Sequence, residues 1–408
     1  MRTLVTDIGL LAGIGTGLRK EGLAMSEVGC LKDAWLLIDG EVIAGFGAMA
    51  DRLPSDVDET ADVAGRMVIP AFCDSHTHAV WAGSREREFE DKIRGLSYAE
   101  IAANGGGILN SADLLHRTGE DELFAQSIVR VREMMAAGSG AIEIKSGYGL
   151  STEDELKMLR VIRRIREEVP AVVKSTFLGA HAVARGMTRE NYVRLVCDEM
   201  IPAVAAERLA DFVDVFCEEG FFTPEDTALI LETAARYGLR PKLHANQLAV
   251  SGGVQVAVAH GALSADHLER TTRAEIECFK GSGTMPTMLP GASFFLREPY
   301  GNARGFIDAG LGVALASDYN PGTSPSGDMR FVMALGCIQM RLTPEQAFNA
   351  VTINSAYAMG VSDIAGSIAS GKLANIIVTR PGFDSIGSLA YRYSTPFIEK
   401  VILRGKSL

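Results

Sequence analysis

Two histidines one residue apart stand where an apolar run ends, and they are the first residues in the chain that suggest chemistry. The run Met67-Val68-Ile69 leads through Pro70 to His76 and His78. On a β-strand, residues i and i+2 project from the same face, so these imidazoles can occupy two corners of one metal site. Neutral imidazole suits zinc or iron. An isolated pair of this kind also fits surface histidines, so the interpretation depends on further ligands.

Further candidate ligands stand at the ends of later apolar runs. The chain has seven histidines, and five of them end or follow a run of strand length: His76, His78, His181, His244 and His267. Asp318 ends the last such run and is followed by a turn. Three imidazoles and one carboxylate suit one metal ion with an open position for water. We therefore predict His76, His78, His244 and Asp318 as metal ligands, with His267 nearby and free to move protons. The alternative for each is a structural, hydrogen-bonded polar group.

These side chains can meet only if the strands that carry them lie side by side. From Met67 onward, apolar runs of strand length alternate with amphipathic helical stretches, which is typical of parallel strands covered on both faces. Eight strands alternating with helices predict an α/β fold of the (β/α)8 TIM-barrel type over residues 67–361, with chemistry at the carboxyl ends of the strands. The predicted strands are Met67–Cys73, Gly140–Lys145, Val172–Gly179, Asp211–Cys217, Arg240–Ala245, Ala262–Asp266, Gly283–Leu289 and Gly312–Asp318.

Both ends of the chain have a different texture, with short strand-like runs separated by turn signals. Asp39-Gly40 between two such runs predicts a hairpin. We expect residues 1–66 and 362–408 to form one small β-sandwich-like domain. Within the barrel, Ser151, Thr223 and Thr343 each begin a stretch that can form a helix capping box.

Composition limits the partners. The formal charge is -11, and acidic and basic residues are interleaved, so we expect neither nucleic acid nor a membrane surface as partner. The six cysteines show no CxxC spacing, which indicates reduced thiols. Neither a leader peptide nor an apolar run of about 18 residues is evident. We expect a cytoplasmic protein that acts on a small molecule.

Longer motifs resemble the amidohydrolase superfamily of metal-dependent hydrolases and, within it, the imidazolonepropionase family. Blocks such as Lys-Ser-Gly-Tyr-Gly and Phe-Leu-Gly-Ala-His make the resemblance specific, and the blocks occur in the right order over nearly the whole chain. The matching stretches are 76–78 through 83–86, 105–108, 143–150, 176–181, 294–300 and 318–322.

The resemblance implies hydrolysis of the cyclic amide of 4-imidazolone-5-propanoate to N-formimidoyl-glutamate in histidine degradation. Water activated by the metal would attack the ring carbonyl. His267 would activate that water or steady the carbonyl oxygen, and Asp318 would pass a proton to the departing ring nitrogen. Relatives are often homodimers, which we adopt as an expectation. A relative acting on another cyclic amide or amidine, such as a deaminase, and a metal-free binding protein stay as alternatives.

By resemblance, seven residues form the substrate-binding set: Arg85, Tyr148, His181, Gln247, Asn320, Gly322 and Thr323. Arg85 offers a planar fork to a carboxylate, although a surface ion pair with Glu86 or Glu88 is the alternative. Some relatives carry Glu where this chain has Gln247. A glutamine cannot act as a base, so we place Gln247 beside His267 and Asp318 in the catalytic set only through hydrogen bonds.

The sequence also indicates how many metal ions are bound and what one glycine-rich segment does. Two-metal relatives bridge their ions with a carbamylated lysine at the end of the fourth strand, but that strand ends here in Phe216-Cys217-Glu218-Glu219. We therefore expect one zinc or iron ion per subunit. Gly105-Gly106-Gly107 lacks the Lys-Ser/Thr context of a phosphate-binding loop, so we interpret it as a flexible loop near the mouth of the site.

Overall fold

Apolar runs form the strands of a parallel barrel in the computed structural model, which describes residues 1–96 and 106–408. Within these residues, strands at eight consecutive positions pair in parallel in chain order. Nearly every strand residue is buried, as expected for a sheet covered on both faces. The strands are β6 (Phe72–Thr77), β7 (Ser139–Lys145), β8 (Val172–Ala180), β9 (Phe212–Cys217), β10 (Arg240–Pro241) with β11 (Leu243–Ala245), β12 (Ser264–His267), β13 (Met285–Met288) and β14 (Ala314–Leu315).

Backbone hydrogen bonds close the barrel between its last and first strands. The amide of Asp318 donates to the carbonyl of His76 at 3.0 Å, and the amide of His78 donates to the carbonyl of Tyr319 at 2.9 Å. The predicted (β/α)8 architecture is therefore confirmed, and two predicted ligands lie on the closing seam.

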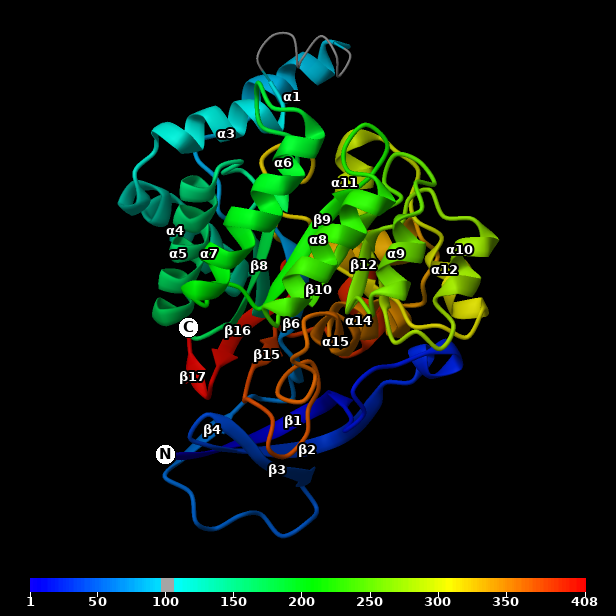
Figure 1. Cartoon of the computed structure of the whole chain (residues 1–408). Helices are drawn as coiled ribbons and strands as arrows, with labels where there is room; N and C mark the ends of the chain where they lie inside the picture. Colours follow the sequence, from blue (N-terminus) through cyan, green and yellow to red (C-terminus); the bar gives the residue numbers. More distant parts are fainter. Residues whose placement is uncertain (97–105) are drawn as a thin grey trace.

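Helices surround the barrel, as Figure 1 shows. Thr223 and Thr343 form the predicted capping boxes. The box predicted at Ser151 is only half formed: Ser151 accepts from the amide of Asp154, whose carboxylate instead contacts His116 and Lys157. The helices are α1 (Glu86–Ile93), α3 (Ile108–Arg117), α4 (Glu120–Ala136), α5 (Thr152–Glu168), α6 (Arg189–Leu195), the π-helical turn η2 (Val196–Met200), α7 (Ile201–Ala206), α8 (Pro224–Arg236), α9 (Gly253–Ala259), α10 (Arg273–Cys278), α11 (Pro290–Leu296), α12 (Ala303–Asp308), α13 (Met329–Ile338), α14 (Pro344–Val351), α15 (Ile353–Ala358) and α16 (Ile386–Tyr391).

Strands from both chain ends form one mixed sheet below the barrel in Figure 1. Its order is β17-β16-β15-β5-β1-β2-β3, with β4 paired to β1, and its apolar side chains form a cluster of their own. The predicted hairpin at Asp39-Gly40 is confirmed by the pairing of β2 and β3. The strands are β1 (Arg2–Ile14), β2 (Gly29–Asp39), β3 (Val42–Ala48), β4 (Glu59–Asp62), β5 (Met67–Pro70), β15 (Ile376–Thr379), β16 (Ile398–Leu403) and β17 (Lys406–Ser407), with the 3-10 turn η1 (Gly22–Ser26) after β1.

The prediction of Met67–Cys73 as the first barrel strand is wrong. Met67–Pro70 is β5 of the mixed sheet, and the barrel strand β6 begins at Phe72. The change of sheet occurs between adjacent residues, because the amide of Ala71 donates to Asn375 whereas that of Phe72 donates to Gly138. His76 consequently lies within the strand and not after it.

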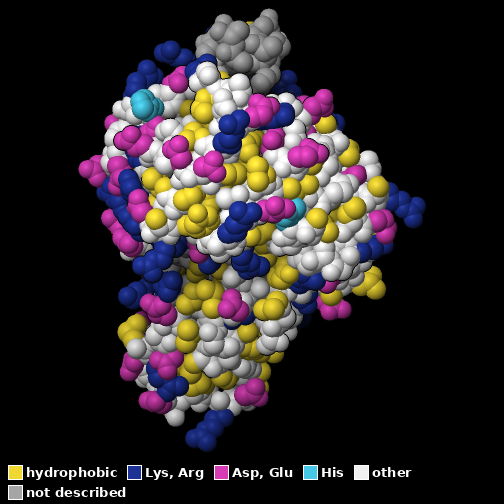
Figure 2. Space-filling model, viewed as in Figure 1, with side chains coloured by type: hydrophobic (Ala, Val, Ile, Leu, Met, Phe, Trp, Pro, Cys, Tyr) yellow, Lys and Arg dark blue, Asp and Glu magenta, His cyan; other side chains and the backbone are white. Residues whose placement is uncertain are grey.

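Lys and Arg side chains are interspersed with Asp and Glu over the face shown in Figure 2, in line with the interleaved charges of the sequence. Within the described part of the chain, none of the helices combines the length and apolar character needed to cross a membrane.

Candidate metal centre and substrate cavity

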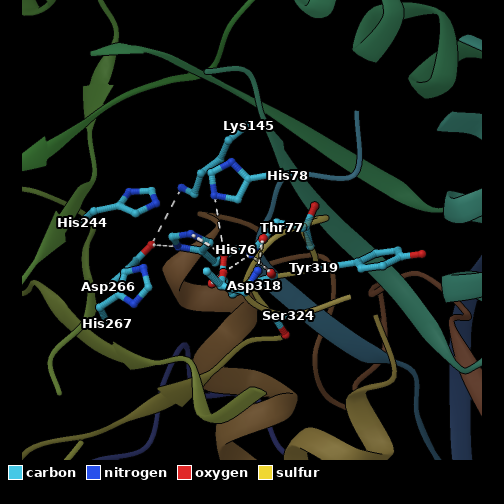
Figure 3. A network of polar contacts seen from close by, with 12 residues as sticks. His76, Thr77, His78, Lys145, His244, Asp266, His267, Asp318, Tyr319 and Ser324 are labelled. Carbon is cyan, nitrogen blue, oxygen red and sulfur yellow. Dashed lines mark hydrogen bonds and ion pairs between the residues drawn. The ribbon is translucent and has the colours of Figure 1, made fainter. Parts of the chain in front are cut away.

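Four histidines and one aspartate from the carboxyl ends of the barrel strands meet at one point, as Figure 3 shows. His76 lies in β6 and His78 directly after it, His244 is in β11, His267 ends β12, and Asp318 follows β14. The Nε2 atoms of His76 and His78 each lie 3.6 Å from Asp318 Oδ1. Two overlapping groups, His76 with His78 and Asp318 and His76 with His244 and His267, have the spacing of metal ligands. The predicted ligands therefore lie close together, as expected for residues at the carboxyl ends of barrel strands.

Two imidazole nitrogens at this cluster, His76 Nε2 and His244 Nε2, are buried and have no hydrogen-bond partner among the described residues. His78 faces Asp318 through Nε2, and its Nδ1 is also buried without a partner among them. Burying a polar atom without a partner is costly unless a ligand satisfies it. Imidazole nitrogens and one carboxylate form the donor set of a zinc or iron site. The residues present therefore fit a divalent metal ion.

Burial favours the neutral form of His76 and His78, which is the form that binds metal. Desolvation lowers the pKa of His76 well below its usual value, and the positive charge of Lys145 lowers it further. The pKa of His78 is also lowered by desolvation and by neighbouring imidazoles. Desolvation raises the pKa of Asp318 to about 6, since the carboxylate is fully enclosed. A cation among these groups would counter that cost by favouring the ionised carboxylate.

Buried carboxylates orient two of the histidines from behind. His76 Nδ1 lies 2.6 Å from Asp266 Oδ2, and His244 Nδ1 lies 2.9 Å from Asp214 Oδ2. Each bond turns the Nε2 atom of its histidine toward the cluster, the arrangement by which outer carboxylates commonly fix metal-binding histidines.

Two lysines form a further layer beneath those carboxylates. Lys145 Nζ lies 2.8 Å from Asp214 and 2.6 Å from Glu143, and Lys242 contacts Glu143 and the carbonyl of Ser75. All five side chains, Glu143, Lys145, Asp214, Lys242 and Asp266, are fully buried. Burial opposes the charged form of Lys145, but the carboxylates outweigh it and raise its pKa.

This buried charge layer was not predicted from the sequence. The sequence does contain a pattern that indicates this layer: charged residues interrupt otherwise apolar strands at Glu143, Lys145, Asp214 and Lys242. A charge in a fully buried strand requires a partner, and here the partners come from other strands.

Asp318 begins a loop that is held by its own side chains. Its backbone is left-handed, with φ 53°, which is uncommon for a residue other than glycine and frequently marks a functional site. Asn320 donates to the carbonyl of Asp318 and to Thr323 Oγ1, both at 2.6 Å, and accepts from the amides of Gly322 and Thr323. Thr323 Oγ1 lies 3.4 Å from Asp318 Oδ2. The loop therefore fixes the carboxylate and its neighbours as one unit.

Arg85 lies against this loop at the wall of the cavity. A Cβ added at Gly322 would lie 2.1 Å from Arg85 Nη1, so glycine leaves room for the guanidinium. Arg85 pairs with Glu88 at 2.5 Å, as the alternative interpretation had it, but both side chains are only 10% exposed. Arg85 Nε is buried without a partner among the described residues. The pair is thus part of an enclosed wall and not a surface ion pair.

One cavity of about 410 Å³ is lined by Arg85 and by four members of the cluster, His78, His244, His267 and Asp318. Its wall includes Tyr148, His181, Gln247, Asn320 and Thr323 from the predicted substrate-binding set, whereas Gly322 is set behind Arg85. Apolar side chains complete the wall: Leu96, Ile108, Phe216, Phe221, Leu248, Ala292 and Leu296.

Glu155 shapes the loop that carries Tyr148, a role that the sequence analysis did not find. Its carboxylate accepts from the amides of Gly147, Gly149 and Leu150 at 2.7 to 3.0 Å. His181 Nδ1 lies 3.0 Å from the carbonyl of Gly147. These bonds keep the Tyr148 and His181 side chains at the cavity, and burial lowers the pKa of His181 to about 3.

The predicted loop at Gly105-Gly106-Gly107 is only partly described. Gly105 lies outside the described residues. The amide of Gly107 donates to Glu88 at 3.1 Å, and the adjacent Ile108 lines the cavity. The end of this block therefore lies beside the cavity, where the loop was expected.

Comparison with known proteins agrees with this geometry. The sequence profile of the amidohydrolase family matches residues 217–408. An imidazolonepropionase from Flavobacterium psychrophilum is 49% identical over the full length of both chains. Among solved structures, a triazine hydrolase variant has a TM-score of 0.78 at 16% identity, and an adenosine deaminase from Xanthomonas campestris with bound zinc has 0.74 at 15% identity. They cover 100% and 99% of this chain and 94% and 92% of the solved chains. These two structures share the fold.

Proposed function

The chain belongs to the imidazolonepropionase family, and from this premise we propose that it hydrolyses 4-imidazolone-5-propanoate to N-formimidoyl-glutamate in histidine degradation. The observation that carries the proposal is one cavity whose lining combines His78, His244 and Asp318 of the metal centre with Arg85. A cyclic amide with a carboxylate tail needs both features, one at its carbonyl and one at its tail.

His76, His78, His244 and Asp318 would hold one zinc or iron ion. When bound, the cation supplies Lewis acidity, which polarises a carbonyl and makes a neighbouring water more acidic. Zinc in the related adenosine deaminase structure supports a first-row metal, and the imidazole-rich donor set accepts either ion.

Arg85 would bind the propanoate carboxylate through its planar fork. Tyr148, His181, Gln247, Asn320 and Thr323 would place the ring by hydrogen bonds, while Gly322 leaves space for Arg85. His267 would hold or move a proton at Nε2, because its Nδ1 faces Glu269. Asp318 Oδ2 would deliver a proton to the departing ring nitrogen.

The proposal is tested by following the ultraviolet absorbance of freshly generated 4-imidazolone-5-propanoate with metal-loaded protein. We expect loss of the ring chromophore and formation of N-formimidoyl-glutamate. Asp318→Asn should abolish turnover, whereas Asp308→Asn, which changes a carboxylate 67% exposed on α12, should not. An intact ring would refute the substrate, and ammonia release from aminopurines would favour a deaminase.

We also propose a cytoplasmic homodimer. All six cysteines are free thiols, which fits a reducing compartment. The dimer rests on resemblance to the family. Light scattering of the purified protein at micromolar concentration measures its mass, and a value near that of one chain would refute the dimer.

A further inference from the structure

Glu269 is a buried carboxylate on the cavity wall to which the proposed mechanism gives no direct contact with substrate. Its side chain is 4% exposed. Oε1 lies 3.3 Å from His267 Nδ1 and 3.5 Å from Ser293 Oγ. Oε2 is buried and has no hydrogen-bond partner among the described residues. A buried carboxylate oxygen without a donor is costly, so its position on a ligand cavity implies a donor on the ligand.

The backbone before Glu269 is strained in a way that brings it to the cavity. His267 and Leu268 have φ values of 84° and 65°, two adjacent left-handed residues that are not glycine. Such a backbone conformation is costly for residues with a Cβ and persists where the surroundings impose it. The amide of Leu268 donates a hydrogen bond to the carbonyl of Ala245, the last residue of β11, and the amide of Arg270 donates to that of Asn246, so both bonds hold the turn. As a result, the side chains of His267 and Glu269 line the same cavity.

The other carboxylates that line the cavity, within the described residues, are already engaged. Asp318 faces the histidines of the metal centre. Glu298 is 49% exposed and pairs with Arg270 at 2.7 Å. Glu269 is also engaged with His267 through Oε1, but its buried Oε2 has no partner among the described residues.

The proposed reaction creates a need for the negative charge of Glu269. Water oxygen joins the carbonyl carbon as the bond from this carbon to the ring nitrogen breaks, which leaves a carboxylate. Both protons of the water end on the two amidine nitrogens, because amidines are stronger bases than carboxylates. A neutral ring thus opens into an anion at one end and a formamidinium cation at the other, and a carboxylate would stabilise that cation.

We propose that Glu269 is a catalytic residue that binds the amidine end of the substrate. Oε2 accepts a hydrogen bond from an amidine N–H and stabilises the positive charge that develops there as the ring opens. Oε1 meanwhile keeps His267 oriented. This inference rests on the proposed function and adds to it a specificity for ligands with an amidine or amidinium group.

The test compares binding of two ligands to metal-loaded protein by calorimetry. N-formimidoyl-glutamate carries the amidinium, and N-formyl-glutamate has the same shape with a neutral oxygen in its place. We expect wild type to prefer the amidinium by about tenfold or more, since a hydrogen bond between charged partners is worth at least about 1.4 kcal/mol. Glu269→Gln should remove the preference. The matched control Glu298→Gln, at the same cavity, should keep it.

An unchanged preference in Glu269→Gln, or none in wild type, would overturn the role of Glu269. Thermal melting checks that the variant folds. If it does not, Glu269→Asp keeps the charge but withdraws the carboxylate, and a preference equal to wild type in that variant would likewise overturn the inference. Ring opening by wild type is scored separately, so the proposed function fails only if the ring stays intact.

Discussion

Charged side chains lie both in the buried layer beneath the histidines, here called the floor, and on the cavity wall around Arg85 and Lys92, here called the mouth. The two regions hold these charges differently. On the floor, Lys145 and Lys242 face three carboxylates, and all five side chains are fully buried. At the mouth, Arg85 has one carboxylate partner and a buried Nε without a partner among the described residues, and Lys92 is partly exposed. The charged groups of the floor pair with one another, whereas those at the mouth keep N–H donors that can bind a substrate.

Charged side chains therefore serve structure on the floor and substrate binding at the mouth. A charge that is enclosed by partners fixes its neighbours, and removing one partner leaves the others buried and uncompensated. A charge with spare donors can contact substrate, and removing it weakens binding with less effect on the fold. Floor substitutions should therefore reduce stability and metal affinity, and mouth substitutions should raise KM.

The largest effect is expected for Lys145→Met on the floor. Glu143 and Asp214 lose their shared partner, and breaking a buried pair costs about 3–5 kcal/mol of unfolding free energy. Because Asp214 orients His244, metal affinity should fall by about 10–100-fold. Urea unfolding and competition with a zinc-binding dye measure both quantities.

Lys280→Met is the matched control, because Lys280 is 46% exposed and pairs with Glu277 on the surface. It should cost less than about 1 kcal/mol and leave metal affinity unchanged. Equal effects of the two variants would remove the distinction between floor and surface charges.

An intermediate effect is expected for Arg85→Lys at the mouth. Lysine keeps the charge but loses the fork that can bind a carboxylate with two bonds. We expect KM to rise about tenfold with a smaller change in kcat, the pattern of lost ground-state binding. Steady-state kinetics measure this, and the exposed neighbour Arg87→Lys is the control. A fall in kcat at constant KM would place Arg85 in the chemical step instead.

The smallest effect is expected for Lys92→Met. Lys92 donates to the carbonyl of Gly322 at 2.9 Å and lies 5.5 Å from the ring centre of Phe295, so it steadies the loop behind Arg85. Burial and the charge of Arg85 both lower its pKa. We expect KM to rise about two- to fivefold, in keeping with one modest hydrogen bond. Lys92→Arg should restore it, and a stability loss as large as that of Lys145→Met would contradict the comparison.

Most of the fold followed from the order of apolar runs, since parallel strands covered on both faces leave a clear pattern. The exception was Met67–Cys73. An apolar run indicates that a segment is buried, but it does not show which sheet the segment joins. Here the backbone hydrogen bonds pass from one sheet to the other between Ala71 and Phe72. That information lies in Asn375 and Gly138, far away in the sequence.

The candidate site was predictable to the extent that it obeys the strand-end rule. His76, His78, His244, His267 and Asp318 met as expected, because each stands at or near the end of a strand. The buried charge layer did not follow from the sequence. Lys242 and Glu143 are 99 residues apart, and local patterns carry no record of such pairs. Glu269 was missed because only the left-handed turn before it brings it to the cavity.

The seam that closes the barrel has a consequence for how the protein matures during synthesis. Asp74 accepts two hydrogen bonds from Ser317, 243 residues later in the chain, beside the backbone bonds that join His76 to Asp318. A nascent chain therefore exposes His76 and His78 long before the ribosome has made Asp318. A metal ion held by the proposed ligands would stabilise the closed barrel by mass action, because a partial chain lacks Asp318. The ion would therefore stabilise only a chain that already includes Asp318.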